Sequence, residues 1–206
     1  DLKHVDIVAE IIDARIPISS RNPDIDAICA DKPRLIVLNR ADQADPAQNR
    51  AWGEYFRKKG YAVLETDAKT GRGVNQFSSV TQEVLKEQIS KWREKGQVGR
   101  PVRAMVVGVP NVGKSTFINR LRDSAAAKAG NRPGVTRGKQ WIVVGPYLEF
   151  LDTPGMLWPK FEDKEAARRL AFLGSIRGEI MDNERLSAEL LEFLRDRAPE
   201  GAKARL

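Results

Sequence analysis

The sequence predicts an α/β fold with a mostly parallel six-stranded sheet and helices on both faces. Six short apolar runs rich in β-branched residues alternate with helical patterns along the chain. This alternation is typical of parallel sheets, because two parallel strands need a long crossover that is usually a helix. The chain has 206 residues, of which 41% are hydrophobic, so it can form one substantial core and an appendage.

The six predicted strands are apolar runs that are bounded by turn or helix signals. They are Val5–Ile12, Leu35–Leu38, Tyr61–Leu64, Val102–Val107, Trp141–Val144 and Tyr147–Leu151. Ligands of open parallel sheets bind beyond the carboxyl ends of the strands. The residues that directly follow these runs are therefore the first candidates for function.

The clearest helical pattern runs from Val74 to Trp92, where spacings of three and four build one apolar stripe. The segment Lys91–Pro101 loses this periodicity and contains two glycines and a proline, so it is predicted to be a linker. After Phe161 no strand is indicated, and two helical patterns follow. We expect a main domain at residues 1–180 and the start of an incomplete helical domain at residues 181–206.

Composition excludes several classes of protein. No apolar run approaches the ~20 residues that cross a bilayer, and no segment near the start resembles a signal peptide. The single cysteine, Cys29, excludes an internal disulfide framework. We expect a protein without a membrane partner, located in the cytosol. A monomer is the favoured state.

The charge is basic and locally concentrated. The formal net charge is +7, and residues 100–140 contain nine Lys or Arg and one Asp. This surplus indicates either a solvated face with phosphate-binding residues or a surface that binds nucleic acid. Charge by itself favours neither.

The strongest motif is Gly108–Ser115, with the sequence GVPNVGKS, directly after the predicted strand Val102–Val107 and before a helical segment. This spacing is typical of a phosphate-binding loop, in which backbone N–H groups surround the α- and β-phosphates and the lysine reaches the β- and γ-phosphates. A glycine-rich turn without a ligand is the alternative. The predicted phosphate-binding residues are Pro110, Asn111, Val112, Gly113, Lys114, Ser115 and Thr116.

A second motif, Asp152-Thr-Pro-Gly155, follows the last predicted strand. Asp152 can hold Mg²⁺ through a water molecule, together with the Ser115 hydroxyl, and the Gly155 N–H can meet a γ-phosphate. Between the two motifs, Thr136 in a basic stretch is a candidate for the second hydroxyl on Mg²⁺. A plain surface loop is the alternative for that stretch.

A third motif, Asn39-Arg40-Ala41-Asp42, follows the predicted strand Leu35–Leu38. The Asp42 carboxylate can accept two hydrogen bonds from guanine N1 and N2, a donor pair that adenine lacks. The Ala68 N–H can meet guanine O6, and the stem of Lys69 can cover the base. These residues favour guanine over adenine, although a helix N-cap is an ordinary explanation for such a tetrapeptide.

Together the motifs resemble those of Ras-like P-loop GTPases, but the base-reading motif precedes the phosphate loop. This circularly permuted order, with the sequences at Asp13–Pro23, Arg132–Trp141 and Leu151–Asp163, resembles the YlqF/RbgA family of ribosome-biogenesis GTPases. The resemblance covers nearly the whole chain. It implies a P-loop GTPase fold and a base-reading role for Asn39, Arg40 and Asp42, with Arg40 where the family has a lysine.

The resemblance also implies a function. We expect a GTP-binding and GTP-hydrolysing assembly factor for the large ribosomal subunit, which contacts rRNA and ribosomal proteins and is released after hydrolysis. Lys114, Thr136 and Gly155 are expected to act at the γ-phosphate, and Asn111 is expected to help hold K⁺. Met156 stands where Ras-like enzymes have a water-orienting glutamine. Hydrolysis is therefore expected to be slow until the ribosome stimulates it.

Two other functions stay open at this point. A nucleotide-gated module that binds RNA or protein, with negligible hydrolysis of its own, is favoured by Met156. A P-loop kinase or ATPase also fits the phosphate loop, but Asp42 argues against it. If the chain is a GTPase, the basic residues of the stretch Arg120–Lys139 are expected to face ribosomal RNA.

Overall fold

The computed structural model describes residues 2–29, 31–129, 141–144, 147–152, 163–175 and 183–200. Its strands are β1 (Ile7–Asp13), β2 (Arg34–Asn39), β3 (Ala62–Thr66), β4 (Val102–Val107), β5 (Trp141–Val143) and β6 (Leu148–Asp152). They form one sheet in the order β3-β2-β1-β4-β6-β5. All neighbours are parallel except β5 and β6, which are antiparallel. The predicted six-stranded, mostly parallel sheet is thus confirmed.

Seven α-helices and three short 3-10 helices connect these strands among the described residues. The α-helices are α1 (Asp24–Ile28), α2 (Pro46–Lys58), α3 (Phe77–Val84), α4 (Lys86–Glu94), α5 (Lys114–Ala129), α6 (Lys164–Phe172) and α7 (Asn183–Arg197). The 3-10 helices are η1 (Leu2–His4), η2 (Ala41–Gln43) and η3 (Val74–Gln76).

Local sequence explains where two helices begin. The Asp45 carboxylate accepts a hydrogen bond from the Ala47 N–H, and Pro46 occupies the first turn of α2. The Asp163 carboxylate accepts from the N–H groups of two residues in the first turn of α6. Such caps satisfy N–H groups that have no partner inside the helix.

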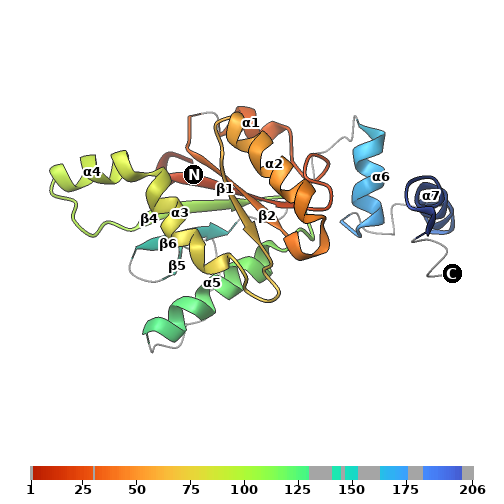
Figure 1. Cartoon of the computed structure of the whole chain (residues 1–206). Helices are drawn as coiled ribbons and strands as arrows, with labels where there is room; N and C mark the ends of the chain where they lie inside the picture. Colours follow the sequence, from red (N-terminus) through yellow and green to blue (C-terminus); the bar gives the residue numbers. More distant parts are fainter. Residues whose placement is uncertain are drawn as a thin grey trace. The chain divides into compact units, whose positions relative to one another are not determined.

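Helices cover both faces of the sheet (Figure 1). On one face, Phe56 of α2 packs with Ile12 and Ile36. On the other face, Phe77 of α3 packs against Phe117 of α5 and Phe150 of β6, with ring centroids 5.4 and 5.3 Å apart. Every residue of β1 and β2 is buried, as expected for central strands that are covered on both sides.

The helical pattern from Val74 to Trp92 forms η3, α3 and α4 rather than one helix: η3 leads directly into α3, and the chain turns at Leu85 between α3 and α4. The Thr81 hydroxyl donates to the carbonyl oxygens of Phe77 and Ser78, and this kind of back-bonding bends helices. The predicted linker is wrong in its first four residues, which form the last turn of α4. Trp92 holds this turn, because its buried ring packs beneath the guanidinium of Arg100.

The chain divides into two compact units, residues 1–158 and 159–206. This division lies 22 residues before the boundary expected at residue 180. The second unit therefore includes α6 as well as α7. Within that unit, Phe172 of α6 and Phe193 of α7 have ring centroids 6.1 Å apart. No helix of the described residues is long and apolar enough to cross a membrane.

Candidate functional site

The phosphate loop and the residues that follow β2 and β3 meet at the carboxyl edge of the sheet. The strand order changes direction between β1 and β4, since β2 and β3 lie beyond β1 while β6 and β5 lie beyond β4. Such a switch point leaves a crevice between loops that leave the sheet in opposite directions. The loops after β1, β2, β3 and β4 all leave from this edge.

The phosphate loop follows β4 and leads directly into α5. Glycine is required at two positions of this loop, because the loop backbone passes very close to neighbouring segments and because φ is positive there. A Cβ atom on Gly108 would lie 2.4 Å from the Ile11 carbonyl oxygen. Gly113 has φ +100°, and a Cβ atom there would lie 2.3 Å from Asn39 Nδ2. Only glycine lets the loop pass this close to β1 and to the end of β2.

Lys114, the first residue of α5, is buried against the loop that precedes it. Its Nζ donates to the carbonyl oxygens of Gly108 and Val109, at 3.0 Å each. Ser115 and Thr116 are exposed in the first turn of α5. The lysine charge thus lies along the inner side of the loop, at the positive end of the α5 dipole.

Asn39 joins three segments of the site. Its Nδ2 donates to the carbonyl oxygen of Val112 at 2.8 Å. Its Oδ1 accepts from Thr66 Oγ1 at 3.1 Å and from the Ala68 N–H at 3.0 Å. A guanine O6 that binds the Ala68 N–H would therefore have to share or replace the bond to Asn39. The side chain couples the phosphate loop to the residues that follow β2 and β3.

Arg40 also contacts the phosphate loop. It adopts a left-handed backbone with φ 60°, and its guanidinium donates to the carbonyl oxygen of Asn111 at 2.8 Å. Its NH1 lies 3.8 Å from Asp13 at the end of β1. Asp13 in turn accepts two bonds from the Arg15 guanidinium, at 2.9 and 2.7 Å. The hydrogen bond with Asp13 raises the pKa of Arg15 above its ordinary value.

The turn after β3 is held by Asp67. Its carboxylate accepts from the N–H groups of Lys69 and Thr70, at 2.9 and 3.3 Å, and from the Thr70 hydroxyl. The hydrogen bond from the Thr70 hydroxyl lowers the pKa of Asp67 below its ordinary value. The turn therefore presents Ala68 and Lys69 in a defined conformation.

Arg120 of α5 completes this turn. Its guanidinium donates to the carbonyl oxygens of Ala68 and Lys69. Arg120 belongs to the basic stretch that was expected to face RNA; its side chain is exposed, and its guanidinium is hydrogen-bonded to backbone of the same chain. Asp13, Arg15 and Asp67 are site residues to which no role was assigned from the sequence, although Asp67 directly precedes the predicted guanine-binding residues Ala68 and Lys69. Asp13 and Arg15 lie in one of the segments that carry the family resemblance, which was the available signal.

These residues enclose a cavity of about 340 Å³. Six predicted site residues line it, and Gln43 and Asp67 complete the wall. The six are Asn39, Arg40, Ala68, Lys69, Gly113 and Thr116. Asp42 is exposed in η2 and does not line this cavity.

The residues expected to hold Mg²⁺ are only partly described. Ser115 presents its hydroxyl at the start of α5, and the backbone of Asp152 pairs with Val106 at the end of β4. Hydroxyl and carboxylate oxygens suit Mg²⁺, so this part of the donor set fits the ion. Thr136 and Gly155 lie outside the described residues, as does the side chain of Asp152. Among the described residues, no cluster of three or more His, Cys, Asp or Glu is placed to hold a metal.

Comparison with known proteins gives consistent matches. The family model described as "50S ribosome-binding GTPase" matches residues 103–200. "Ribosome biogenesis GTPase A" of Priestia megaterium is 49% identical over 205 residues, which cover 99% of this chain and 71% of that protein. "Mitochondrial ribosome-associated GTPase 1" of Mus musculus is 35% identical over 202 residues, covering 94% of this chain and 61% of that protein.

Solved structures agree with the sequence matches. The structure of GNP-bound YlqF from Thermotoga maritima superposes with a TM-score of 0.66 at 30% sequence identity, covering 94% of this chain and 71% of that one. The GDP-bound structure of the same protein gives a TM-score of 0.66 at 29% identity, covering 95% and 73%. The similarity therefore extends over nearly the whole chain.

Proposed function

This chain belongs to the YlqF/RbgA family of ribosome biogenesis GTPase A proteins, and from that premise we propose that it binds and hydrolyses GTP to assist assembly of the large ribosomal subunit. The nucleotide is proposed to lie at the carboxyl edge of the sheet. The observation that carries this assignment is the Asn39 bridge, which joins the phosphate loop to the loop after β3 around one cavity.

The base is assigned to this cavity. Asn39, Arg40, Ala68 and Lys69 surround it, and the stems of Arg40 and Lys69 provide apolar surface for the two faces of a purine. Asp42 is proposed to reach the guanine N1 and N2 donors from the rim. Adenine offers no such donor pair, so an exposed carboxylate at this position discriminates between the two purines.

The phosphates are assigned to the loop after β4, from Pro110 to Thr116. Backbone N–H groups of this loop and the first turn of α5 provide donors and a partial positive charge. The Lys114 ammonium, which lies along the loop at Gly108 and Val109, has to turn toward the β- and γ-phosphates when nucleotide binds. Its carbonyl partners hold it at the loop until then.

Hydrolysis is proposed to proceed by attack of water on the γ-phosphate. Lys114 stabilises negative charge that develops on the phosphoryl oxygens, and the Gly155 N–H is proposed to donate to one of them. Ser115, Thr136 and Asp152 are proposed to hold Mg²⁺, which when bound neutralises charge on the β- and γ-phosphates. Asn111 is proposed to help hold K⁺ beside the phosphates.

The partner is proposed to be the maturing large ribosomal subunit, with rRNA and ribosomal proteins at the contact. The GTP form binds the particle, hydrolysis is stimulated there, and the GDP form leaves. The proposed location is the cytoplasm of a bacterium or, for a eukaryotic source, an organellar matrix. Relatives named for bacterial ribosome biogenesis and for mitochondrial ribosomes support this assignment.

The test is GTP turnover by the full-length protein in KCl, alone and with purified large or small ribosomal subunits. Stimulation by the large subunit only is the expected result. Lys114→Ala is the control for contaminating GTPases, because it should remove tight nucleotide binding and turnover together. Tight GTP binding without stimulation by either subunit would contradict the assembly role.

A further inference from the structure

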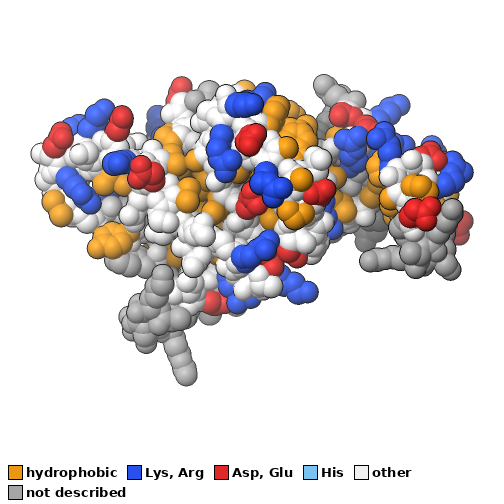
Figure 2. Space-filling view, in the orientation of Figure 1, with side chains coloured by type: hydrophobic (Ala, Val, Ile, Leu, Met, Phe, Trp, Pro, Cys, Tyr) orange, Lys and Arg blue, Asp and Glu red, His pale blue; other side chains and the backbone are white. Residues whose placement is uncertain are grey.

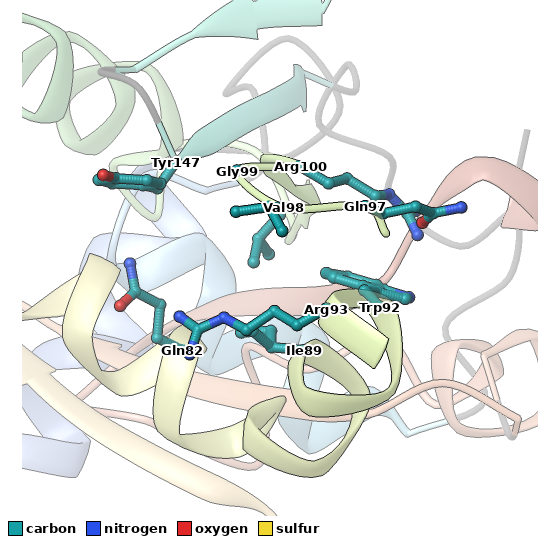
Figure 3. Close-up of a pocket in the computed structure, with 10 residues that line it drawn as sticks. Gln82, Ile89, Trp92, Arg93, Gln97, Val98, Gly99, Arg100 and Tyr147 are labelled. Carbon is teal, nitrogen blue, oxygen red and sulfur yellow. The ribbon is translucent and has the colours of Figure 1, made fainter. Parts of the chain in front are cut away.

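A second pocket lies at the opposite edge of the sheet from the nucleotide site. It has a volume of about 300 Å³ and is formed by α3, α4, the segment that joins α4 to β4, and Tyr147 just before β6 (Figure 3). Val102, the first residue of β4, belongs to its lining, whereas the phosphate loop follows the last residue of β4. The two sites are thus separated by the length of the strand.

The pocket combines an apolar floor with an exposed aromatic ring. Ile89 and Val102 line it, and Val98 projects into it from the segment after α4 (Figure 3). Tyr147 is 55% exposed and Val98 is 79% exposed, so one aromatic and one aliphatic side chain of the lining present apolar surface to solvent. The Tyr147 carbonyl oxygen accepts from the Val102 N–H at 2.9 Å, so the backbone beneath this ring is held to β4.

Polar groups face the ring from the other side. Gln82 of α3 and the Arg93 side chain of α4 lie together, across the pocket from Tyr147 (Figure 3). Arg93 has no ion-pair partner among the described residues, whereas Arg100 is bound to Asp6 at 2.9 Å and lies 3.9 Å above the Trp92 ring centre. Arg100 therefore shapes the wall, and Arg93 is available to a ligand.

The surroundings are positively charged. Residues 86–100 contain five Lys or Arg and two Glu, but Lys86 pairs with Glu83 at 3.5 Å and Arg100 pairs with Asp6 at 2.9 Å. The cations of this segment without an ion-pair partner among the described residues are Lys91, Arg93 and Lys95. Lys91, Arg93 and Lys95 are all exposed, and Lys and Arg side chains are interspersed with apolar atoms over α4 in the space-filling view (Figure 2). This surface is complementary to a polyanion.

We propose that this pocket binds one unstacked base of a single-stranded RNA segment, with the base against Tyr147 and a neighbouring phosphate on Arg93. An aromatic ring beside a basic groove is the general solution for single-stranded nucleic acid, because every base has a face that can stack. The Gln82 amide provides one donor and one acceptor for the base edge. A pocket of this size accepts a single ring system. The Lys and Arg side chains of α4 lie where they can contact the phosphate groups of the RNA on either side of that base.

The inference rests on the proposed ribosomal role, since a maturing ribosomal particle presents unpaired RNA. It adds a defined contact point at the amino end of β4, whereas the nucleotide site lies at the carboxyl edge of the sheet. RNA bound here would leave the GTP site open. Both ligands can therefore be held at once.

The test is direct binding of a fluorescein-labelled single-stranded RNA of about ten nucleotides, long enough for one such site, to the full-length protein saturated with a non-hydrolysable GTP analogue. Tyr147→Ala should weaken binding about 5- to 100-fold, because stacking on one aromatic ring is lost. Tyr147→Phe, which keeps the ring, should bind like the wild type. Arg93→Ala should weaken binding and reduce the slope of log affinity against log salt by about one.

The matched control is Arg50→Ala, which removes one exposed positive charge from α2 on the other face of the sheet. It should leave RNA affinity almost unchanged. If Arg93→Ala and Arg50→Ala weaken RNA binding equally, the affinity depends only on the net charge of the protein and not on this pocket. That result would overturn the proposal. Wild-type RNA affinity in Tyr147→Ala, or no RNA binding by the wild type at low salt, would also overturn it.

Three further outcomes separate this inference from its alternatives and from the proposed function. Displacement of the RNA by an equal concentration of a free mononucleotide would make the pocket a small-ligand site instead. Normal RNA binding by the Tyr147→Ala variant, with loss of stimulation by the large subunit, would assign the pocket to a ribosomal protein. Subunit-stimulated turnover without RNA binding would leave the proposed function standing and reject only this pocket.

Discussion

The side chain of Asn39 donates from Nδ2 to the carbonyl oxygen of Val112 at 2.8 Å, across 73 residues of sequence. The bond is buried, and the Oδ1 atom of the same side chain accepts from Thr66 and Ala68. The phosphate loop and the base-binding loop are consequently held by one amide group. A change at Asn39 must therefore affect both ends of a bound nucleotide.

Asn39→Ala should weaken GDP and GTP binding about 10- to 100-fold. The substitution removes three hydrogen bonds, each worth about 1 kcal/mol net, and leaves buried partners at Val112 and Ala68 unsatisfied. The measurement is titration with a fluorescent guanine nucleotide. Thr81→Ala is the control, because Thr81 is equally buried but bonds only within α3. Equal affinity of both variants would reject the coupling role.

Gly113→Ala should lose tight nucleotide binding, because a Cβ atom there would lie 2.3 Å from Asn39 Nδ2 and the loop would have to move. Gly96→Ala is the control that shows the effect of backbone strain without a clash. Gly96 also has positive φ, at +77°, but a Cβ atom there would meet nothing within 4 Å. Gly96→Ala should lower the free energy of unfolding by about 1 kcal/mol, the usual cost of a left-handed residue, without changing nucleotide affinity.

Arg120→Ala should weaken binding of guanine nucleotides, because the carbonyl oxygens of Ala68 and Lys69 lose the guanidinium that holds them. We expect a loss of about 5- to 20-fold, as for one or two charge-assisted hydrogen bonds at a partly exposed site. Calorimetric titration with GDP measures it. Arg122→Ala, two residues along the same helix, is the control and should bind GDP normally.

The contribution of Asp67 to stability should change with pH only in acid. Its pKa lies below the ordinary value of about 3.9, so the ionised carboxylate stabilises the fold above that pH. The difference in unfolding free energy between the wild type and Asp67→Asn should be constant at neutral pH. It should shrink as the pH falls below about 4, because the wild-type carboxylate then becomes protonated. Denaturant titrations over that range measure it, and a difference that grows in acid would contradict the pKa direction.

GTP turnover should be faster in KCl than in NaCl if Asn111 helps to hold a potassium ion. Asn111 has φ 61° within the phosphate loop, so Asn111→Gly removes the amide while keeping a backbone that glycine adopts readily. This variant should show equal turnover in the two salts, with GDP affinity little changed. Equal rates in KCl and NaCl for the wild type would exclude the potassium role.

Local sequence was sufficient for the strands and the phosphate loop. The predicted strand Val102–Val107 matches β4, and the loop that follows has the glycines its tight path requires. These signals are local, because a buried strand needs a run of apolar residues and a loop around phosphates needs small residues at set spacings. The motif order and the resemblance to a permuted GTPase family were also readable from the sequence.

The helix break at Leu85 was not readable, because the apolar stripe continues through it with the same periodicity. The internal use of Arg120 was equally hidden. A basic residue on a helix is compatible with solvent, RNA or a neighbouring carbonyl group, and nothing within its own segment distinguishes them. Its partners, Ala68 and Lys69, lie 52 and 51 residues away in sequence.

The sequence by itself determined the strands, the phosphate loop and the order of the motifs, since each depends on neighbouring residues. Only the tertiary structure decided that Asn39 bridges two loops, that Arg120 holds the turn after β3, and that Tyr147 faces Arg93 across a second pocket. The physical reason is that sheet order brings together side chains from distant segments. These hydrogen bonds and cavities form between residues that are far apart in sequence, so no local sequence pattern predicts them.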